Sequence, residues 1–386
     1  MTNSRIFDYV LVGGGLHNSL VALALHDMQP NASVVLIEKE LHIGGNHTWC
    51  FHEQDIPEQA RPFVEPMVSS SWPGYEVIFP RYRRQLDSRY EGLRSEDLDS
   101  AVIDSFERTK SSALLRGAPV SRVAADHVIL EDGSKIEGRC VFDARGPDAW
   151  TAGLGETGYQ KFLGIEVELT RPHGLERPIL MDASVPQADG FTFFYVLPLT
   201  PDTLLVELTF FSDTPDLDGE WAEEQIEEYA IQQGWSFQRA LRRERGSIPL
   251  PVEFERPPME WPLIWGYSGG WFHPATGYSF PIAVNLAVLV GRTPLERVIE
   301  AVRSCEQSYR RSFRFALRLN GLLFRWFRPE HRVGAFERFY RNDEEQIKRF
   351  YALRMSGWDR MRLMIGRPPR GFSVRARLGR ASRLGR

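Results

Sequence analysis

A chain of 386 residues with 42% hydrophobic and 25% charged residues has the composition of a globular protein with at least one large core. It contains no run of about 18 apolar residues, which excludes a helix that spans a membrane. The net charge of -4 hides an asymmetry, because residues 301–386 carry 22 Lys and Arg against 7 Asp and Glu. This basic end predicts an anionic partner, either lipid headgroups or nucleic acid.

The cysteines indicate the chemical environment of the protein. Cys50, Cys140 and Cys305 are widely spaced and form no metal-binding pattern, so we expect no metal site and a reduced, cytoplasmic setting. The first predicted strand lies so close to the start that we also expect no signal peptide.

The stretch from Asp8 to Glu38 predicts a strand, a helix and a second strand. Asp8–Val12 is β-branched and aromatic, Leu16–Met28 repeats apolar residues at helical spacing, and Ser33–Ile37 is a second apolar run. A strand-to-helix turn of this kind is typical of dinucleotide-binding folds. From this unit we assign to a dinucleotide cofactor Gly13, Gly14, Gly15, Leu16, Asn18 and Glu38.

The residue types in this turn suit a dinucleotide. Gly13 allows a sharp turn, Gly15 removes a side chain that would block a pyrophosphate, and the amides at the helix start favour negative charge. Glu38 ends the second strand, where an acid accepts hydrogen bonds from ribose hydroxyls. Asn18 departs from the usual third glycine, and the alternative is a glycine-rich turn in an unrelated α/β domain.

Three later segments extend the predicted cofactor site. The loop His42–Glu53 contains Gly45 at the place where ribose and adenine would lie. Alternating strands over Leu114–Ala144 end in a small residue followed by Arg145 and Gly146, an exit that recurs beneath the cofactor in flavoproteins with two dinucleotide folds. An ordinary strand-to-loop exit is the alternative.

The loop Gly266–Pro281 precedes an apolar helix over Ile282–Val290, which predicts a second helix start facing the flavin. His273, Thr276 and Gly277 are its candidate cofactor residues, and a purely structural loop is the alternative.

A separate sheet is predicted from Phe162–Glu168, Phe191–Leu199 and Thr203–Phe211, together with the aromatic, extended segment Trp72–Tyr82. The helical segment Tyr309–Phe327 interleaves arginines with Phe, Trp and Leu, as helices at a membrane interface do. A core helix with a solvated basic face is the alternative.

Together these patterns predict an α/β flavoprotein with a Rossmann-like FAD-binding lobe, a β-sheet substrate lobe and a helical C-terminal region. The expected boundaries are 1–70, 96–150 and 263–300 for the FAD-binding lobe, 71–95 and 151–262 for the substrate lobe, 301–370 for the basic, membrane-facing helices, and 371–386 for a disordered tail.

Long segments over nearly the whole chain resemble the bacterial lycopene β-cyclases. Those segments include VGGGLHNSLVALAL, GGNHTWCFHE, WPGYEVIFP, FDARGP, MDASVPQADGFTFFYVLPLT, TLLVELTFFSD, ERGSIPLP and HPATGYSFPIAVNLA. The resemblance implies cyclisation of the ψ-ends of lycopene, through γ-carotene to β-carotene, without net redox change. It also implies reduced FAD, with NADPH as the electron source. An acid would protonate C2, the cation at C1 would move to C5 on ring closure, and a C6 proton would leave.

Glu207 is the first candidate for the acid, because its strand is otherwise apolar or aromatic and burial keeps a carboxyl protonated. It resembles the first acid of the family's acidic pair, while the second position is Leu208. A solvent-facing strand residue is the alternative. Asp182 is the second candidate, although a capping role explains it equally well. Aromatic side chains that would line the pocket are Phe191, Phe193, Phe194, Tyr195, Trp271, Phe272 and Phe280.

The basic end fits a substrate that dissolves in bilayers, so we expect peripheral binding to the cytoplasmic face of a membrane and no nucleic acid partner. Alternatives on the same fold are a flavin monooxygenase, a prenyl or carotenoid reductase, and a cyclase that forms ε-rings or one ring only. The loop HPATGYSFP lacks the Gly-Asp pair usual in the monooxygenases and reductases. A flavin-binding membrane scaffold without chemistry is the alternative from another class.

Overall fold

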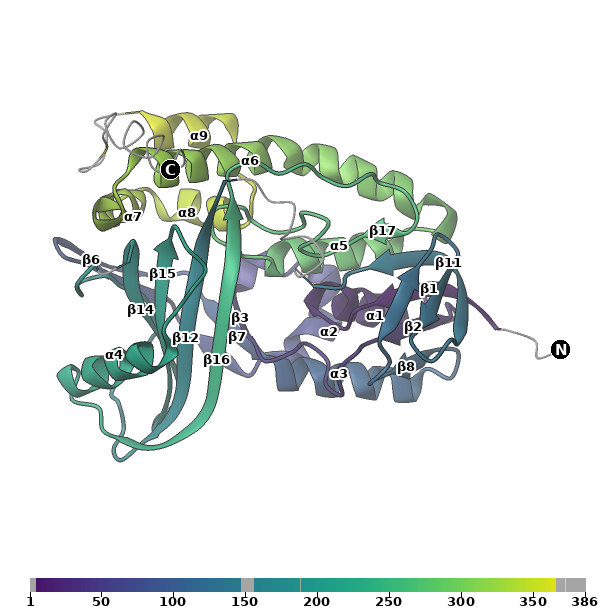
Figure 1. The fold of residues 1–386 in the computed structure, drawn as a ribbon, viewed down its shortest axis with the longest axis horizontal. Helices are drawn as coiled ribbons and strands as arrows, with labels where there is room; N and C mark the ends of the chain where they lie inside the picture. Colours follow the sequence, from purple (N-terminus) through teal and green to yellow (C-terminus); the bar gives the residue numbers. More distant parts are fainter. Residues whose placement is uncertain (1–4, 147–155, 188, 366–371, 373–386) are drawn as a thin grey trace, which may run out of the picture.

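The computed structural model describes residues 5–146, 156–187, 189–365 and 372, and it has two lobes and a group of C-terminal helices (Figure 1). The first lobe, at the right of Figure 1, contains the N-terminal strand-helix-strand unit, and the second lobe is a large curved sheet. This arrangement confirms the predicted architecture.

The first sheet has the strand order β8-β2-β1-β11-β10-β9, and β17 pairs with β11. Its strands are β1 (Ile6–Val12), β2 (Val34–Ile37), β8 (Ala113–Leu115), β9 (Val120–Val123), β10 (His127–Leu130), β11 (Lys135–Asp143) and β17 (Leu263–Ile264). The central pairings β1 with β2 and β1 with β11 are parallel, as expected for strands joined by helical crossovers. The helices of this lobe are α1 (Leu16–Met28), α2 (Arg61–Val64), α3 (Ser95–Arg108) and α5 (Phe280–Arg292).

The helix α1 is buried almost all round, because it packs between this sheet and α5. Its predicted bounds match the observed ones, and the two strands that flank it form where the apolar runs predicted them.

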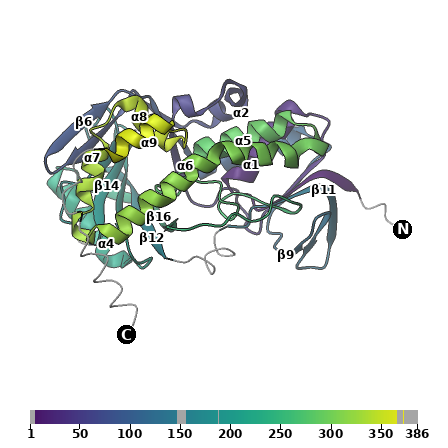
Figure 2. The same cartoon turned by 90° about the horizontal axis from the view of Figure 1, so that it is seen from above.

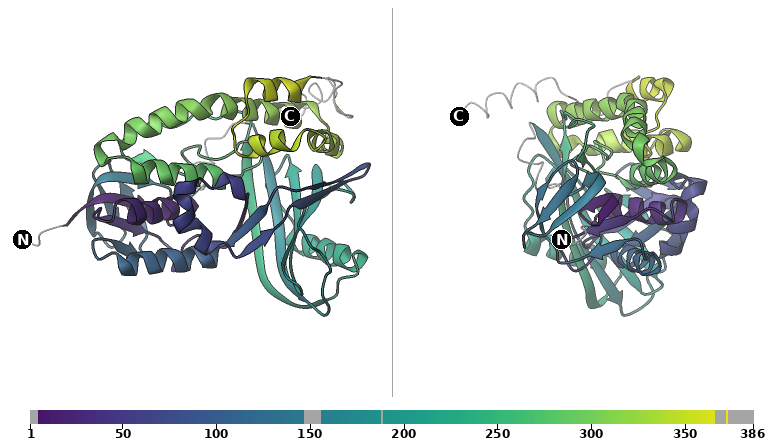
Figure 3. Two further views of the ribbon diagram at one scale, coloured as in Figure 1. Left: turned by 180° about the vertical axis from the view of Figure 1, so that it is seen from behind. Right: turned by 90° about the vertical axis from the view of Figure 1, so that its right-hand side faces the viewer.

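The second sheet has the order β16-β12-β15-β14-β13-β5-β6 and is antiparallel except where β13 meets β5. Its strands are β5 (Tyr75–Phe79), β6 (Tyr82–Leu86), β12 (Thr157–Leu169), β13 (Ile179–Asp182), β14 (Phe191–Thr200), β15 (Thr203–Ser212) and β16 (Phe237–Pro251). Helix α4 (Gly219–Gln232) covers one face of this sheet, and Figure 3 shows it from behind, at the end away from the C-terminal helices. Alternate residues of each strand therefore point toward α4 or toward the rest of the protein.

A third, three-stranded sheet has the order β3-β7-β4, from β3 (Thr48–His52), β4 (Ser70–Trp72) and β7 (Tyr90–Arg94). The segment 71–95, which we assigned to the substrate lobe, is thus divided: β5 and β6 join the second sheet, while β7 pairs with β3.

The C-terminal helices are α6 (Val298–Trp326), α7 (Val333–Phe339), α8 (Glu344–Tyr351) and α9 (Gly357–Met364). Figure 2 shows α6 running from above α5 to the second sheet, with α9 beside its C-terminal half. Because α6 buries Phe313 in the core of the first lobe and Phe324 in a core of the second, it ties the lobes together.

The core-helix interpretation therefore applies to the buried stripe of α6, while its basic face is exposed. In the part of the chain that the structure describes, no helix is long and apolar enough to cross a membrane. The predicted disordered tail, 371–386, lies outside the described residues apart from Phe372.

Candidate active site between the two lobes

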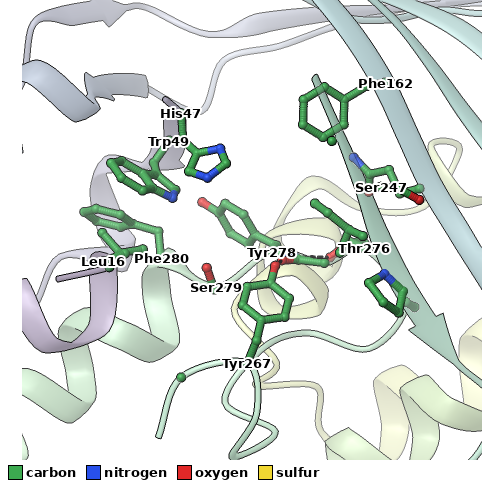
Figure 4. Close-up of a pocket in the computed structure, with 18 of the residues that line it drawn as sticks. Leu16, His47, Trp49, Phe162, Ser247, Tyr267, Thr276, Tyr278, Ser279 and Phe280 are labelled. Atoms are coloured by element: carbon green, nitrogen blue, oxygen red, sulfur yellow. Dashed lines mark hydrogen bonds between the residues drawn. The ribbon is translucent and has the colours of Figure 1, made fainter. Parts of the chain in front are cut away.

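A cavity of about 1280 Å³ is lined by residues of both lobes and of the C-terminal helices. Small-molecule sites are typically about 300–1,000 Å³, so this one has room for a cofactor and part of a second ligand. Figure 4 shows its central part, with Trp49, Tyr267, Tyr278 and Phe280 around the open space.

The glycine turn between β1 and α1 forms one end of the cavity. Gly13 has φ +91°, and a Cβ there would lie 2.7 Å from the carbonyl oxygen of Ala144, so this position requires glycine. A Cβ at Gly15 would meet no protein atom within 4 Å, and Gly15 lines the cavity. The space in front of the start of α1 is therefore open to an anionic group, and these residues fit the pyrophosphate of a dinucleotide.

Glu38 is placed beside this turn. Its Oε2 accepts a hydrogen bond of 2.6 Å from the amide of Gly14, and its carboxylate lines the cavity. An acid in this position suits ribose hydroxyls.

The structure brings most of the predicted cofactor residues to one cavity. Those that line it are Gly13, Gly15, Leu16, Glu38, Gly45, Arg145, Gly146, Thr276 and Gly277. The guanidinium of Arg145 is held by two hydrogen bonds to Asp143, of 2.9 and 2.7 Å.

Gly14, Asn18 and His273 support the site without lining the cavity. Asn18 Nδ2 donates to the carbonyl oxygens of Val12 and Gly13, both at 3.0 Å, and thus ties α1 to the turn. His273 is buried, and burial lowers its pKa to about 3, so its ring is neutral. Its Nδ1 accepts a hydrogen bond from the amide of Ala275 and fixes the loop before α5.

Several cavity residues were absent from our sequence-based assignments. His17 lies on α1 with Nε2 2.9 Å from the carbonyl oxygen of Trp271, and burial lowers its pKa to about 4. The hydroxyl of Tyr278 donates to Asp55 Oδ2 at 3.1 Å. His47, Trp49 and Tyr267 also line the cavity, and only their occurrence in glycine-rich loops signalled them.

The predicted aromatic residues divide between the cavity and the core. Phe193, Tyr195 and Phe280 line the cavity. Phe191, Trp271 and Phe272 are buried in the cores, and Phe194 points toward α4, where it stacks on Tyr229 with ring centroids 3.9 Å apart.

Glu207 lies in the middle of β15 and lines the cavity, with 8% of its surface exposed. The hydroxyl of Thr209 donates to its Oε1 at 2.5 Å. Burial, and next the nearby carboxylate of Glu244, raise the pKa of Glu207 to about 8. A carboxyl group that is protonated near neutral pH therefore faces the cavity, as a general acid requires.

Glu244 was also absent from our sequence-based assignments. It is buried on β16, where its Oε2 lies 3.1 Å from Arg242 Nη1 and accepts from the hydroxyl of Thr48 at 3.3 Å. The sequence gives no signal for this neighbour of Glu207, since 36 residues separate the two.

Asp182 ends β13 on the side of the sheet that faces α4. Its Oδ2 accepts a hydrogen bond of 2.9 Å from Tyr229, and its Oδ1 accepts one of 3.1 Å from the amide of Ser184. Asp182 therefore does not line the cavity, whereas Glu207 does.

The two sheets, the dinucleotide turn and the C-terminal helices together have the fold of the FAD-dependent monooxygenases. It is similar to the flavin-dependent brominase Bmp2, with a TM-score of 0.64 and 13% identity over 98% of this chain and 100% of that chain. It is also similar to PqsL, a probable FAD-dependent monooxygenase from Pseudomonas aeruginosa, with a TM-score of 0.57 and 16% identity over 90% of this chain and 99% of that chain. These likenesses show the fold, and the residues of the dinucleotide turn fit a dinucleotide such as FAD.

The sequence comparisons give the family. The model of the family described as lycopene cyclase protein matches residues 8–377. A lycopene beta-cyclase of Pseudescherichia vulneris is 38% identical over 377 residues, and one of Pantoea ananas is 37% identical over 372 residues. The alignments cover 94% of this chain and 94–95% of the relatives. The chain belongs to the lycopene cyclase family.

Proposed function

We propose that this protein is a lycopene β-cyclase that acts with FAD in carotenoid biosynthesis. It converts the ψ-ends of lycopene into β-rings, through γ-carotene to β-carotene, without net redox change. The observation that carries the proposal is Glu207, a buried and protonatable carboxyl group on the wall of a cavity that also contains the dinucleotide turn. Membership of the lycopene cyclase family supports the same substrate.

The dinucleotide turn would hold the cofactor. The open space at Gly15 accommodates the pyrophosphate, Glu38 accepts from ribose hydroxyls, and Thr276 and Gly277 belong to the loop before α5 on the flavin side. When bound and reduced, FAD would supply an electron-rich ring that stabilises positive charge nearby. We further propose NADPH as the source of its electrons.

The acid step belongs to Glu207. Its carboxyl group donates a proton to C2 of the terminal isoprene unit, which leaves a tertiary cation at C1. Ring closure moves the cation to C5, and loss of a C6 proton completes the β-ring. The walls contributed by Phe193, Tyr195 and Phe211 keep water away from the cation and offer aromatic faces to it.

A membrane surface would deliver the substrate, and two features support this part of the proposal. The segment after α8 exposes large apolar side chains, with Trp358 at 64%, Met364 at 50% and Ile365 at 61% exposure. Met364 and Leu363 also line the cavity, so the apolar patch adjoins its entrance. We therefore propose that the protein binds the cytoplasmic face of the membrane peripherally.

The basic face of α6 would add electrostatic attraction to anionic lipids. Arg310, Arg311, Arg314 and Arg318 are exposed and form no ion pair with any residue that the structure describes. Each such charge near an anionic surface contributes about 1 kcal/mol.

The test is anaerobic incubation of the purified protein with lycopene in liposomes, FAD and dithionite, followed by pigment analysis. We expect β-carotene from the wild type, none from Glu207→Gln, and β-carotene from the control variant Asp182→Asn. Ring formation by Glu207→Gln would move the acid elsewhere. Absence of any ring product from the wild type would overturn the proposed function.

A further inference from the structure

Three neighbouring strands bring two glutamates to the same level of the second sheet. Gly164, in the middle of β12, is paired with Glu207 on β15 and with Glu244 on β16. Residues that are directly opposite one another across antiparallel strands point to the same face. Both glutamate side chains therefore leave the sheet on the side of the cavity, with one residue between them.

That intervening residue has no side chain. A Cβ at Gly164 would lie 3.0 Å from Glu244 Cγ and 3.4 Å from Glu207 Cβ. The two glutamates thus lean over Gly164 from opposite sides, and the nearby carboxyl group of Glu244 raises the pKa of Glu207. A larger residue at this position would force them apart.

The surroundings of the two carboxyl groups differ. Glu244 has a cation and a hydroxyl, because Arg242 Nη1 lies 3.1 Å from its Oε2 and Thr48 donates to the same atom. Glu207 receives a hydrogen bond from the neutral hydroxyl of Thr209. When the two carboxyl groups hold one proton between them, the negative charge is therefore better stabilised on Glu244, and the proton resides on Glu207.

Other titratable and charged groups surround the pair on the neighbouring strands. They are Tyr195 on β14, Glu166 on β12, Cys50 on β3, Tyr90 and Arg94 on β7, and His47 before β3. Glu166 is already paired with Arg94 at 2.8 Å and with Arg242 at 3.1 Å, so it takes up part of the positive charge around the pair.

We propose that Glu207 and Glu244 share one proton as a pair, and that Glu244 is a positioning residue that sets the protonation of the acid Glu207. This inference rests on the proposed cyclase function for its chemistry. Two carboxylates so close together disfavour double ionisation, so the pair retains a proton to a higher pH than either carboxyl group alone. Glu207, which lines the cavity, presents that proton to the substrate.

The pair also accounts for the return of the proton. When Glu207 gives its proton to C2, two carboxylates face each other across Gly164, and Glu207 becomes a better proton acceptor than an ordinary carboxylate. Recovery of the proton lost from C6 relieves this repulsion. One proton enters the substrate and one leaves it, so neither an oxidant nor a reductant is consumed.

The experiment is a pH titration of the purified holoprotein. The infrared absorption band of protonated carboxyl groups is measured at each pH. The band of Glu207 is identified by its loss in Glu207→Gln. We expect Glu244→Gln to lower the midpoint of this band by about one pH unit or more. Gly164→Ala, which retains both carboxyl groups but separates them, should lower it by a smaller amount.

Glu166→Gln is the matched control, because it removes another buried carboxylate beside Arg242 without changing the contact across Gly164. We expect its midpoint to remain at the wild-type value or to fall by less than in Glu244→Gln. The fall of cyclisation rate at high pH should move with the infrared midpoint in each variant, and Glu244→Asp should restore part of the shift.

An unchanged midpoint in both Glu244→Gln and Gly164→Ala would overturn the proposal that the two glutamates share a proton. If Glu244→Gln does not fold, Gly164→Ala alone decides, since both carboxyl groups remain in it. The infrared titration requires no turnover. A protein that forms no ring but titrates as expected would refute the cyclase function and still support the shared proton.

Discussion

Glu207 and Leu208 are neighbours in the chain, but their side chains lie on opposite faces of the second sheet. Glu207 lines the cavity, whereas Leu208 is 2% exposed and belongs to the core beneath α4. The position at which the family motif has a second acid therefore does not face the cavity in this protein. A second carboxyl group beside Glu207 comes instead from Glu244, two strands away.

Leu208→Ala should reduce stability and leave the acid chemistry intact. Truncation of a buried leucine typically costs about 2–5 kcal/mol of unfolding free energy, because it leaves a cavity. The loss is measured by urea unfolding, and ring formation is measured per molecule of bound flavin. A variant of wild-type stability that forms no rings would contradict the assignment of Leu208 to the core.

The raised pKa of Glu207 predicts how stability depends on pH. Its pKa moves from an ordinary value of 4.5 to about 8 on folding. Between these values the folded protein binds the proton and the unfolded chain releases it, so the unfolding free energy falls as pH rises. The contribution is about 1.4 kcal/mol per pH unit.

The difference in unfolding free energy between the wild type and Glu207→Gln isolates this contribution. As pH rises from 5 toward 8, we expect the unfolding free energy of the wild type to fall relative to that of Glu207→Gln. Outside this range the difference should stay constant. Urea unfolding at several pH values measures it. A difference that does not change with pH would mean that Glu207 ionises normally in the folded protein.

The parts of the fold that depend on local pattern were predictable from the sequence. The helix Leu16–Met28 was predicted with its observed bounds, and the strands at its two ends were correct within two residues, because apolar periodicity and glycines define them locally. The prediction of a dinucleotide cofactor rests on this unit, since its turn chemistry is also local.

The pairing of residues across the second sheet was not predictable in this way. Glu244 meets Glu207 only because β12 lies between β15 and β16 in one register, and a shift of one residue would turn a glutamate to the other face. The same limit applied to Asp182, whose short polar motif gave no indication that its strand would direct it toward α4. Strand order and register arise from the packing of the whole domain.

Gly15→Ala should weaken FAD binding without unfolding the protein. The backbone there has φ -72°, which alanine adopts readily, and a Cβ meets no protein atom within 4 Å. The added methyl group would instead occupy the space proposed for the pyrophosphate. We expect affinity for FAD to fall at least tenfold, or about 1.4 kcal/mol, in a fluorescence titration of the apoprotein.

Gly357→Ala on α9 is the control, because a Cβ there also has room and lies away from the dinucleotide turn. Its affinity for FAD should equal that of the wild type. Equal affinity in Gly15→Ala would place the pyrophosphate elsewhere in the cavity.

Membrane binding is best tested by point substitutions, since removal of residues 301–386 would also remove Phe313 and Phe324 from the cores. Trp358→Ala should weaken sedimentation with anionic vesicles roughly tenfold or more, because burial of a large apolar side chain contributes about 1.5–3 kcal/mol. Ile231→Ala is the control, since Ile231 is 74% exposed and belongs to α4, which Figure 3 shows at the end of the second sheet away from the C-terminal helices. Added salt should weaken binding of the wild type by screening its basic face. Equal losses in the two variants, or none in Trp358→Ala, would show that the segment around α9 is not the membrane contact.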